Sequence, residues 1–422
     1  MILPKFWTII EWLDAVKITH GQNQKNVVDP NGVYPIYGSG GQIGKSSQSL
    51  CEAGSTVIGR KGTINKPFFS CTDFWNIDTA FGVTPKEGIL PKYLFLFCLY
   101  FDFKKLDAST TIPSLTQKNL YGIRMPLPPL TEQHRIVAKI DALFSKLDKG
   151  VETLQAIKQQ LRTYRQAVLK WAFEGKDWEC VTIEHFLSKN GKPMATGPFG
   201  TMLKKHEHKQ SGIPVLGIEN IGKGVFQYGN KIFVTPEKAR ELKSFKLHTN
   251  DVIISRSGTV GELCLVPSEM EDTLMSTNLI RITLDENVIM PKYFIHLFLS
   301  KGIVIDQVKE LCKGSTRDFL NQTILKQIIF PLPSLPEQNK IVTAIESRLS
   351  VCDKLEQIVD ENLAKASALG QSILKKAFEG KLVPQDPNDE PADKLLERIK
   401  TMKTTTVSPK VKDKKGKKNA KK

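Results

Sequence analysis

Apolar side chains recur in steps of three and four residues between positions 140 and 171 of the chain. Nine of the ten positions in this series are apolar, and the exception is Gly150. Such a series, over more than four heptads, is typical of the seam of a coiled coil. We therefore predict a long helix that stops at Gly175, where a glycine can adopt the left-handed conformation. The predicted seam comprises Ile140, Leu143, Leu147, Gly150, Leu154, Ile157, Leu161, Tyr164, Val168 and Trp171.

Residues 126–176 recur as residues 331–381, at a constant offset of 205 and without a gap. Twenty of these 51 aligned positions are identical, which indicates an internal duplication. The second copy predicts a second helix that stops at Gly380, with Leu349 and Leu363 filling turns where its apolar series is interrupted. Its predicted seam comprises Ile345, Cys352, Leu355, Val359, Ala366, Leu369 and Ile373, with interruptions at Arg348, Asn362 and Lys376.

A cluster of prolines precedes each predicted helix and fixes an extended entry. Ser334 with Glu337 has the spacing of a capping box, and Thr131 is the candidate cap of the first helix. A helix of about 44 residues would be roughly 65 Å long, which exceeds the diameter of a small domain. This length favours a coiled coil over the alternative that each stripe packs onto the core of one domain.

The stretches on either side of the first helix combine short Val-, Ile- and Phe-rich runs with Gly, Asn and Asp turns, which predicts an α+β fold for each. A helix is expected in each stretch, from Pro91 to about Phe103 and from Pro291 to about Leu311. The two stretches also resemble each other, because VIGRKGT (57–63) matches IISRSGT (253–259). The predicted organisation is a first domain (1–125), a central helical region (126–176), a second domain (177–330), a C-terminal helical region (331–400) and a lysine-rich disordered tail (401–422).

Two long helices of equal length are expected to pair antiparallel, since the chain must return from the second domain to the first. This connectivity predicts a near-circular molecule with a pseudo-twofold axis and one domain at each end of the coil. Two similar domains at a fixed separation could contact two half-sites on a DNA duplex, on either side of a spacer. The residues selected to represent this coiled coil are Ile140, Leu147, Leu154, Leu161, Val168, Ile345, Leu355, Val359, Leu369 and Ile373.

The formal net charge of the 422 residues is +16, which suggests an acidic polymer as partner. Half of that charge, however, belongs to residues 403–422, which hold nine lysines and one aspartate. Charge alone therefore does not establish binding to nucleic acid. Seven scattered cysteines without a C-x-x-C pair argue against a disulfide framework and a zinc site. No secretion signal or membrane span is evident, so a cytoplasmic location is expected.

The basic residues of the two domains lie on predicted turns between strands, where a DNA backbone could approach closely. Arg60 and Arg256 occupy matching places beside a glycine, and arginine can bind a phosphate or the edge of guanine. The alternative is an ordinary hairpin turn with a solvated arginine. His206 and His208, which follow Lys204 and Lys205, are expected to lie on the surface rather than to bind metal. The candidate DNA-binding residues are Lys45, Arg60, Lys61, Thr63, Lys204, Lys205, Arg256, Ser257, Thr259 and Arg317.

Residues 38–47, GSGGQIGKSS, nearly match the phosphate-binding loop G-x-x-x-x-G-K-S. Ser39 stands where that loop needs glycine, and neither an apolar strand before it nor a periodic helix after it is evident. A glycine-rich loop that brings Lys45 near a DNA phosphate is therefore favoured over nucleotide binding. A nucleotide-dependent enzyme built on this segment stays open as an alternative, as does a coiled-coil scaffold that joins two protein-binding domains.

Several segments resemble the conserved regions of the specificity subunits of type I restriction–modification enzymes. They include the proline-rich run with L-x-E-Q-x-x-I-V, AFEGKLVPQDPNDEP ending at Pro391, GPFGTMLKK (197–205) with GIPVLGIENI (212–221), and YPIYGSGGQIGK (34–45). The resemblance spans roughly residues 1–400. It implies two target-recognition domains joined by antiparallel helices, each domain reading one half of a bipartite, asymmetric DNA site.

The same resemblance implies that the chain is a non-catalytic subunit. Two modification subunits would bind through the helices and methylate adenine with S-adenosylmethionine, and two restriction subunits would add translocation and cleavage driven by ATP, with Mg²⁺. The chain itself would need no cofactor. Methyltransferase, dinucleotide-binding, Walker and nuclease motifs are all missing from the sequence, which agrees with a reader of DNA sequence.

Overall fold

The computed structural model describes residues 3–199, 202–312 and 319–405. The chain divides into two compact units. The first unit combines Met1–Leu154 with Glu361–Lys422, and the second unit is Gln155–Asp360. Each unit therefore contains one globular domain together with half of each long helix. Within the described ranges, no helix is both long and apolar enough to cross a membrane.

The domain of the first unit is built from small antiparallel and mixed sheets. One sheet has the strand order β2-β8-β5-β6, a second has the order β4-β3-β7, and β1 pairs with β9. Its elements are β1 (Thr8–Glu11), α1 (Trp12–Ala15), β2 (Val16–His20), β3 (Tyr34–Gly38), β4 (Gly41–Ser46), β5 (Thr56–Gly59), β6 (Phe68–Phe69), β7 (Trp75–Asn76), β8 (Ala80–Pro85), α2 (Pro91–Tyr100), the 3₁₀ turn η1 (Phe103–Leu106), α3 (Gln117–Tyr121) and β9 (Arg124–Leu127).

The domain of the second unit repeats this topology. Its sheets have the orders β11-β17-β14-β15 and β13-β12-β16, and β10 pairs with β18. Its elements are β10 (Cys180–Thr182), η2 (Ile183–Phe186), β11 (Met194–Thr196), η4 (Lys205–Glu207), β12 (Ile213–Leu216), η5 (Ile218–Asn220), β13 (Ile232–Val234), α5 (Pro236–Glu241), η6 (Lys243–Phe245), β14 (Val252–Ser255), β15 (Leu263–Leu265), η7 (Ser268–Met270), β16 (Leu274–Met275), β17 (Leu279–Ile282), α6 (Pro291–Leu299), α7 (Val304–Cys312), α8 (Gln322–Gln327) and β18 (Ile329–Pro331).

The duplication extends to the way the sheets pair. In each unit the middle strand of the small sheet has one antiparallel and one parallel neighbour: β3 pairs with β4 and β7, and β12 with β13 and β16. The central strands β5 and β14 are buried along their whole length, which explains their uninterrupted apolar runs. The α+β prediction is confirmed for both units.

Both helices expected within the domains differ from the prediction. The helix predicted from Pro291 to about Leu311 is two helices, α6 and α7, because Gly302 between them has a φ of +84° that no helix allows. In the first unit α2 also ends earlier than predicted, at Tyr100.

The two long helices are α4 (Leu130–Phe173) and α9 (Leu335–Phe378), each 44 residues long. Both end as predicted, because Gly175 and Gly380 follow them with φ angles of +70° and +69°. The prediction that Thr131 caps the first helix is wrong. Thr131 lies inside α4, and its hydroxyl donates a hydrogen bond to the Asp389 carboxylate at 2.5 Å.

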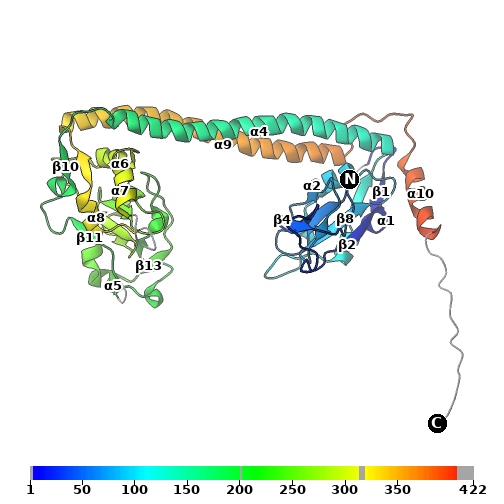
Figure 1. Ribbon diagram of the computed structural model, residues 1–422, viewed down its shortest axis with the longest axis horizontal. Helices are drawn as coiled ribbons and strands as arrows, with labels where there is room; N and C mark the ends of the chain where they lie inside the picture. Colours follow the sequence, from blue (N-terminus) through cyan, green and yellow to red (C-terminus); the bar gives the residue numbers. More distant parts are fainter. Residues whose placement is uncertain (1–2, 200–201, 313–318, 406–422) are drawn as a thin grey trace, which may run out of the picture. The chain divides into compact units, whose positions relative to one another are not determined.

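The two helices pair antiparallel within each unit (Figure 1). In the first unit, Gly370 of α9 lies against the side chain of Leu147 of α4. In the second unit, the Arg165 side chain lies 2.5 Å from Asp353 and 3.0 Å from Glu356. Within the same unit Lys158 lies 2.6 Å from Asp360, so a later residue of α4 contacts an earlier residue of α9 and the helices run in opposite directions.

Matching side chains join the helices to their domains. In the first unit, Gln133 of α4 is fully buried, accepts a hydrogen bond from the Leu90 amide at 2.9 Å and donates to the Gly88 and Pro128 carbonyls. Gln338 of α9 makes the same three bonds in the second unit, to the backbone groups of Met290, Val288 and Pro333. These glutamines belong to the repeated E-Q pair of the sequence, so the duplication is preserved at the level of single atoms.

The C-terminal segment is packed onto the first unit. Figure 1 shows α10 (Ala392–Thr405) beside β1 and α1, where Leu395 and Ile399 are buried. The segment before it is fixed by Asp389, whose carboxylate receives two hydrogen bonds from the Arg135 guanidinium at 2.6 and 3.2 Å. Because α10 includes residues 401–405, the predicted tail begins too early, and residues 406–422 lie outside the described residues.

Acid is expected to loosen this segment. The hydrogen bonds from Arg135 hold the pKa of the Asp389 carboxylate below its usual value of 3.8. A depressed pKa means that the contact stabilises the fold at neutral pH and is lost as the pH falls through the folded pKa, below 3.8. Asp389→Asn should therefore increase the hydrogen exchange of residues 381–400 at pH 7 and remove its acid dependence. Glu397→Gln on the exposed face of α10 is the control, and equal effects of the two variants would contradict the role of Asp389.

Candidate nucleic-acid interface

The Arg60 turn of the first unit is fixed by backbone contacts on both sides. The Arg60 amide donates to the Thr79 carbonyl at 2.7 Å, and the Arg60 carbonyl accepts from the Leu115 amide at 2.8 Å. The guanidinium donates to the Asp78 carbonyl at 3.1 Å. These contacts position the side chain at the end of β5, in a partly exposed site.

The Arg256 turn of the second unit has the same framework. The Arg256 amide donates to the Asn278 carbonyl at 3.0 Å, and the Leu320 amide donates to the Arg256 carbonyl at 3.0 Å. The guanidinium donates to the Thr277 carbonyl at 3.5 Å. The alignment of Arg60 with Arg256, predicted from the sequence, is therefore confirmed down to the contact that each guanidinium makes.

The glycine-rich turn at Ser39 lies against the Arg60 turn. The Ser39 amide donates to the Thr79 hydroxyl at 3.4 Å, so Thr79 contacts both turns. A Cβ placed on Gly59 would lie 3.1 Å from the Ser39 Cβ. Two segments that the sequence analysis selected separately are thus neighbours in space.

The segment that resembles a nucleotide-binding loop does not have that structure. Residues 41–46 form strand β4, which pairs antiparallel with β3, and Lys45 is an exposed strand residue opposite Pro35. A phosphate-binding loop needs free backbone amides at the start of a helix, and here the amides belong to a hairpin. The nucleotide-dependent enzyme considered above is therefore not supported.

The surroundings of Arg256 differ from those of Arg60. The Arg256 guanidinium lies 4.1 Å from the centre of the Phe319 ring and 5.1 Å from that of Phe199. Arg256 is only 6% exposed, and its burial lowers the pKa of the guanidinium. The two phenylalanines were missed by the sequence analysis. Their signal was the occurrence of large apolar residues in polar, glycine-containing loops, which is interpretable only once the arginine between them is known.

The other candidate residues are more exposed. Lys61, Thr63 and Thr259 are exposed, and Ser257 is partly buried, with its hydroxyl donating to Asn278 at 3.1 Å. These residues flank the two arginines and lie on the same turns. Arg317 lies outside the described residues.

Lys204 and Lys205 lie at the start of the short turn η4 and are exposed. The neighbouring Glu207 accepts a hydrogen bond from the Lys204 amide and forms an ion pair of 2.8 Å with Lys238, which offsets part of the local positive charge. The candidate role of this pair in DNA binding thus has less support than that of the arginine turns. Among the described residues, the side chains whose ligand atoms lie close enough together to hold a metal ion are different, exposed ones, His248, Glu271 and Asp272.

The predicted seam of the coiled coil is only partly correct. The structure buries Ile140, Leu161, Val168, Ile345, Val359 and Ile373, and half-buries Leu147 and Leu154. Leu355 and Leu369, however, are 43% and 53% exposed and do not belong to the seam. Leu349 and Leu363 are partly buried, in agreement with the prediction that they fill the turns where Arg348 and Asn362 interrupt the series.

The exposure of Leu355 and Leu369 has a geometric cause. A straight helix has 3.6 residues per turn, whereas steps of three and four residues average 3.5. A series continued in such steps therefore moves gradually off the face that contacts the partner helix. Three predicted seam residues of the second unit are therefore exposed, Tyr164 and Trp171 of α4 and Leu355 of α9, and Val351 and Ile358 of α9 are exposed as well. Exposed apolar side chains spaced in this way on a helix are typical of a docking surface.

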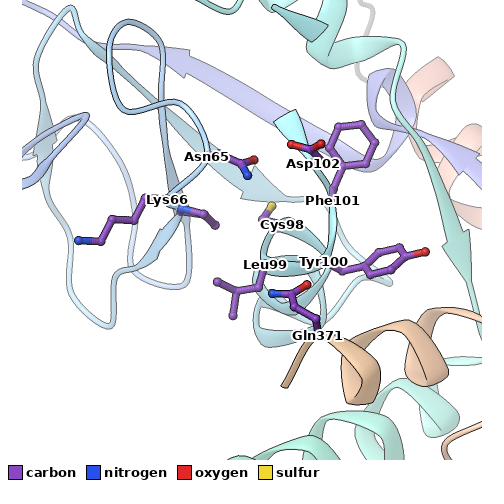
Figure 2. Close-up of a pocket in the computed structure, with 9 residues that line it drawn as sticks. Asn65, Lys66, Cys98, Leu99, Tyr100, Phe101, Asp102 and Gln371 are labelled. Atoms are coloured by element: carbon purple, nitrogen blue, oxygen red, sulfur yellow. The ribbon is translucent and has the colours of Figure 1, made fainter. Parts of the chain in front are cut away.

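A cavity of about 300 Å³ lies in the first unit, between residues 65–67 and the end of α2 (Figure 2). Its lining includes Asn65, Lys66, Tyr100, Asp102 and Gln371. Figure 2 shows these side chains pointing in different directions rather than toward one point. The side-chain oxygen of Asn65 already accepts a hydrogen bond from the Phe103 amide at 2.8 Å. The cavity therefore has no set of convergent polar groups that would define a ligand site.

The arrangement of two related domains with matching basic turns can be compared with known proteins. The family model described as "Type I restriction modification DNA specificity domain" matches the chain twice, at residues 4–161 and 176–363. The chain belongs to this family. Each match covers one domain and part of a long helix, as expected from the duplication.

Relatives of this specificity subunit support the assignment. The chain is 26% identical to the specificity subunit of the type I restriction enzyme EcoDI of Escherichia coli, over 98% of this chain and 99% of that protein. It is 27% identical to the EcoBI specificity subunit of the same species, over 73% of this chain and 70% of that protein.

A solved structure supports the fold of the specificity subunit. It concerns complex assembly and conformational transition of a type I R-M system, and it superposes with a TM-score of 0.68 at 18% identity. The superposition covers 90% of this chain and all of that chain. The family membership and the fold agree, so the role of this chain is DNA specificity within a type I restriction–modification system.

Proposed function

We propose that each unit reads one half of a bipartite, asymmetric DNA site. The observation that carries this proposal is the pair of arginine turns, which share one backbone framework but differ in the side chains around the guanidinium. A shared framework supports the same kind of contact with DNA in both units. Different surroundings support different base preferences, which is what an asymmetric site requires.

The long helices are the proposed docking surface for two modification subunits. The exposed apolar residues of the second unit support this role, since they would otherwise face water at Val351, Leu355 and Ile358. Two restriction subunits would complete the assembly. S-Adenosylmethionine, ATP and Mg²⁺ would be used by these partners for adenine methylation and DNA cleavage, and the chain itself would be non-catalytic.

Footprinting of the complete assembly on a random-sequence DNA library tests the proposed function. One protected sequence with two conserved parts and an unconserved spacer is expected. Its affinity should fall as salt rises, because phosphate contacts release counterions. The isolated chain, without modification subunits, is the comparison and should bind less tightly. Protection without any preferred sequence would contradict the proposal.

The length of the helices is expected to set the length of the spacer. Insertion of four residues after Leu154 in α4 and after Asp360 in α9 lengthens each helix by about 6 Å. Since adjacent base pairs are about 3.4 Å apart, the preferred spacer should grow by roughly two base pairs. Sequencing of the sites methylated by the reconstituted complex measures this change. The same four residues inserted at the exposed turn of Gly191 are the control, and an unchanged spacer in the helix variant would contradict the prediction.

A further inference from the structure

Arg256 is a buried cation with few partners. Within the described ranges, its guanidinium makes a single hydrogen bond, the 3.5 Å contact with the Thr277 carbonyl, and no carboxylate lies within ion-pair distance. The buried Nε has no hydrogen-bond partner. A charged group in this position is costly, because it has left water without gaining a full set of acceptors. Such a group points to a ligand that supplies the acceptors.

The aromatic pair, Phe199 and Phe319, restricts how that ligand can approach. Their rings lie 5.1 and 4.1 Å from the Arg256 guanidinium and are themselves 55% and 39% exposed. Cation–π contacts of this kind hold the guanidinium plane against the rings. With its faces against the rings, the guanidinium is left to meet a ligand through its outer edge, where two N–H groups point in parallel.

The first unit shows that the fold does not require this aromatic pair. In the first unit the Gln117 side chain is hydrogen-bonded to His20 at 2.9 Å. In the second unit Gln322 donates a hydrogen bond to Thr196 at the same distance. His20 and Thr196 therefore occupy equivalent positions, and the loops that follow them can be aligned. By this register Asn23 stands at the position of Phe199.

The partner of the second phenylalanine follows from the backbone in the same way. Leu115 and Leu320 donate to the carbonyls of Arg60 and Arg256, so the residues before them, Ser114 and Phe319, correspond. The first unit thus has two polar residues where the second has two aromatic ones. The aromatic pair is a feature of Arg256 in particular, and packing of the duplicated fold does not explain it.

We propose that Arg256 reads a guanine in the half-site of the second unit, by donating hydrogen bonds from its outer edge to O6 and N7. This inference rests on the proposed function and specifies one base contact within it. The guanine edge offers two acceptors in one plane, which matches the fixed guanidinium. A phosphate is contacted equally well by a flexible, exposed side chain, and the burial of Arg256 would give no advantage there. In the major groove adenine and thymine each offer one acceptor and cytosine offers none, so any other base leaves at least one donor of Arg256 unpaired, which explains discrimination.

The first test leaves the protein unchanged. Each guanine of the preferred site is replaced in turn by 7-deazaguanine, which lacks the N7 acceptor, and the affinity of the complete assembly is measured. At one guanine of the second half-site, the wild-type complex should lose about 5- to 150-fold in affinity. The complex with Arg256→Lys should lose clearly less affinity at that position than the wild type, because lysine lacks the planar pair of donors that contacts O6 and N7 together.

Arg281→Lys is the matched control. Arg281 is buried in the neighbouring strand β17, and its Nε also lacks a partner, but its two terminal nitrogens donate to the carbonyls of Lys246 and Lys192, whereas the terminal nitrogens of Arg256 make one long bond. This variant should keep the wild-type response to 7-deazaguanine at every position, even if its thermal stability is lower. Phe319→Ser, which installs the residue found in the first unit, should weaken the preference for the same guanine without removing the arginine.

The outcomes separate the inference from the proposed function. A relaxed preference at one guanine with Arg256→Lys supports the inference. A uniform loss of affinity across all sequences would identify a phosphate contact and overturn it, as would wild-type preference at every guanine, or a second half-site without guanine. A wild-type complex without any preferred sequence would instead contradict the proposed function itself.

Discussion

Phe378→Ala is expected to lower the free energy of unfolding of the first unit by about 3–5 kcal/mol, the usual cost of deleting a buried ring. Phe378 is the last residue of α9 and is fully buried, with its ring centre 5.1–5.4 Å from those of Tyr93, Phe97 and Tyr100. The end of the helix is therefore part of the core of the domain. Urea denaturation of the full chain measures the change.

Leu369→Ala, nine positions earlier on the same helix, is the matched control for this result. Leu369 is exposed, so its truncation should change stability by less than about 0.5 kcal/mol. Small and equal changes for the two variants would show that α9 is not anchored in the first domain.

Reversal of charge at Arg60 and Arg256 together is expected to weaken specific DNA binding strongly. Each arginine is proposed to make one contact worth about 1–3 kcal/mol, and the two turns belong to different units, so the losses should add to roughly 2–6 kcal/mol. The double variant Arg60→Glu and Arg256→Glu should therefore bind the preferred site about 30- to 10⁴-fold more weakly. The loss is measured by titration of the assembled complex, after circular dichroism has shown that the chain is folded.

The same change of charge at two exposed lysines outside the turns is the control. Lys365→Glu with Lys394→Glu alters α9 and α10 by the same four charges. Only a small loss, from long-range electrostatics, is expected for this control. Equal effects of the two double variants would mean that bulk charge, rather than the arginine turns, determines the affinity. No loss for the arginine variant would favour the scaffold considered in the sequence analysis.

The architecture was predictable because the sequence contains an internal duplication. The gapless repeat of residues 126–176 predicted two helices of equal length, and both are 44 residues long and end at Gly175 and Gly380. The matched GRKGT and SRSGT turns predicted the pair of arginines in the same way. A repeat supports such predictions because a pattern that occurs at matching positions in both copies is rarely accidental.

Features that lie outside the repeat were not predictable. Asp389 contacts Arg135 and Thr131 across more than 250 positions, and no local pattern indicates such a partner. Phe199 and Phe319 likewise meet at Arg256 only because three loops converge. Leu355 was assigned to the seam because periodicity identifies a stripe, whereas small drifts of the helix decide which residues of that stripe are buried.

The central claim, that two related units read two different half-sites, is tested most directly by sequencing the methylated adenines in the genome that encodes this chain. One asymmetric sequence is predicted, with two specific parts separated by a spacer of constant length and one methylated adenine in each part. Methylation at a single contiguous sequence, or at adenines that share no sequence, would contradict the claim.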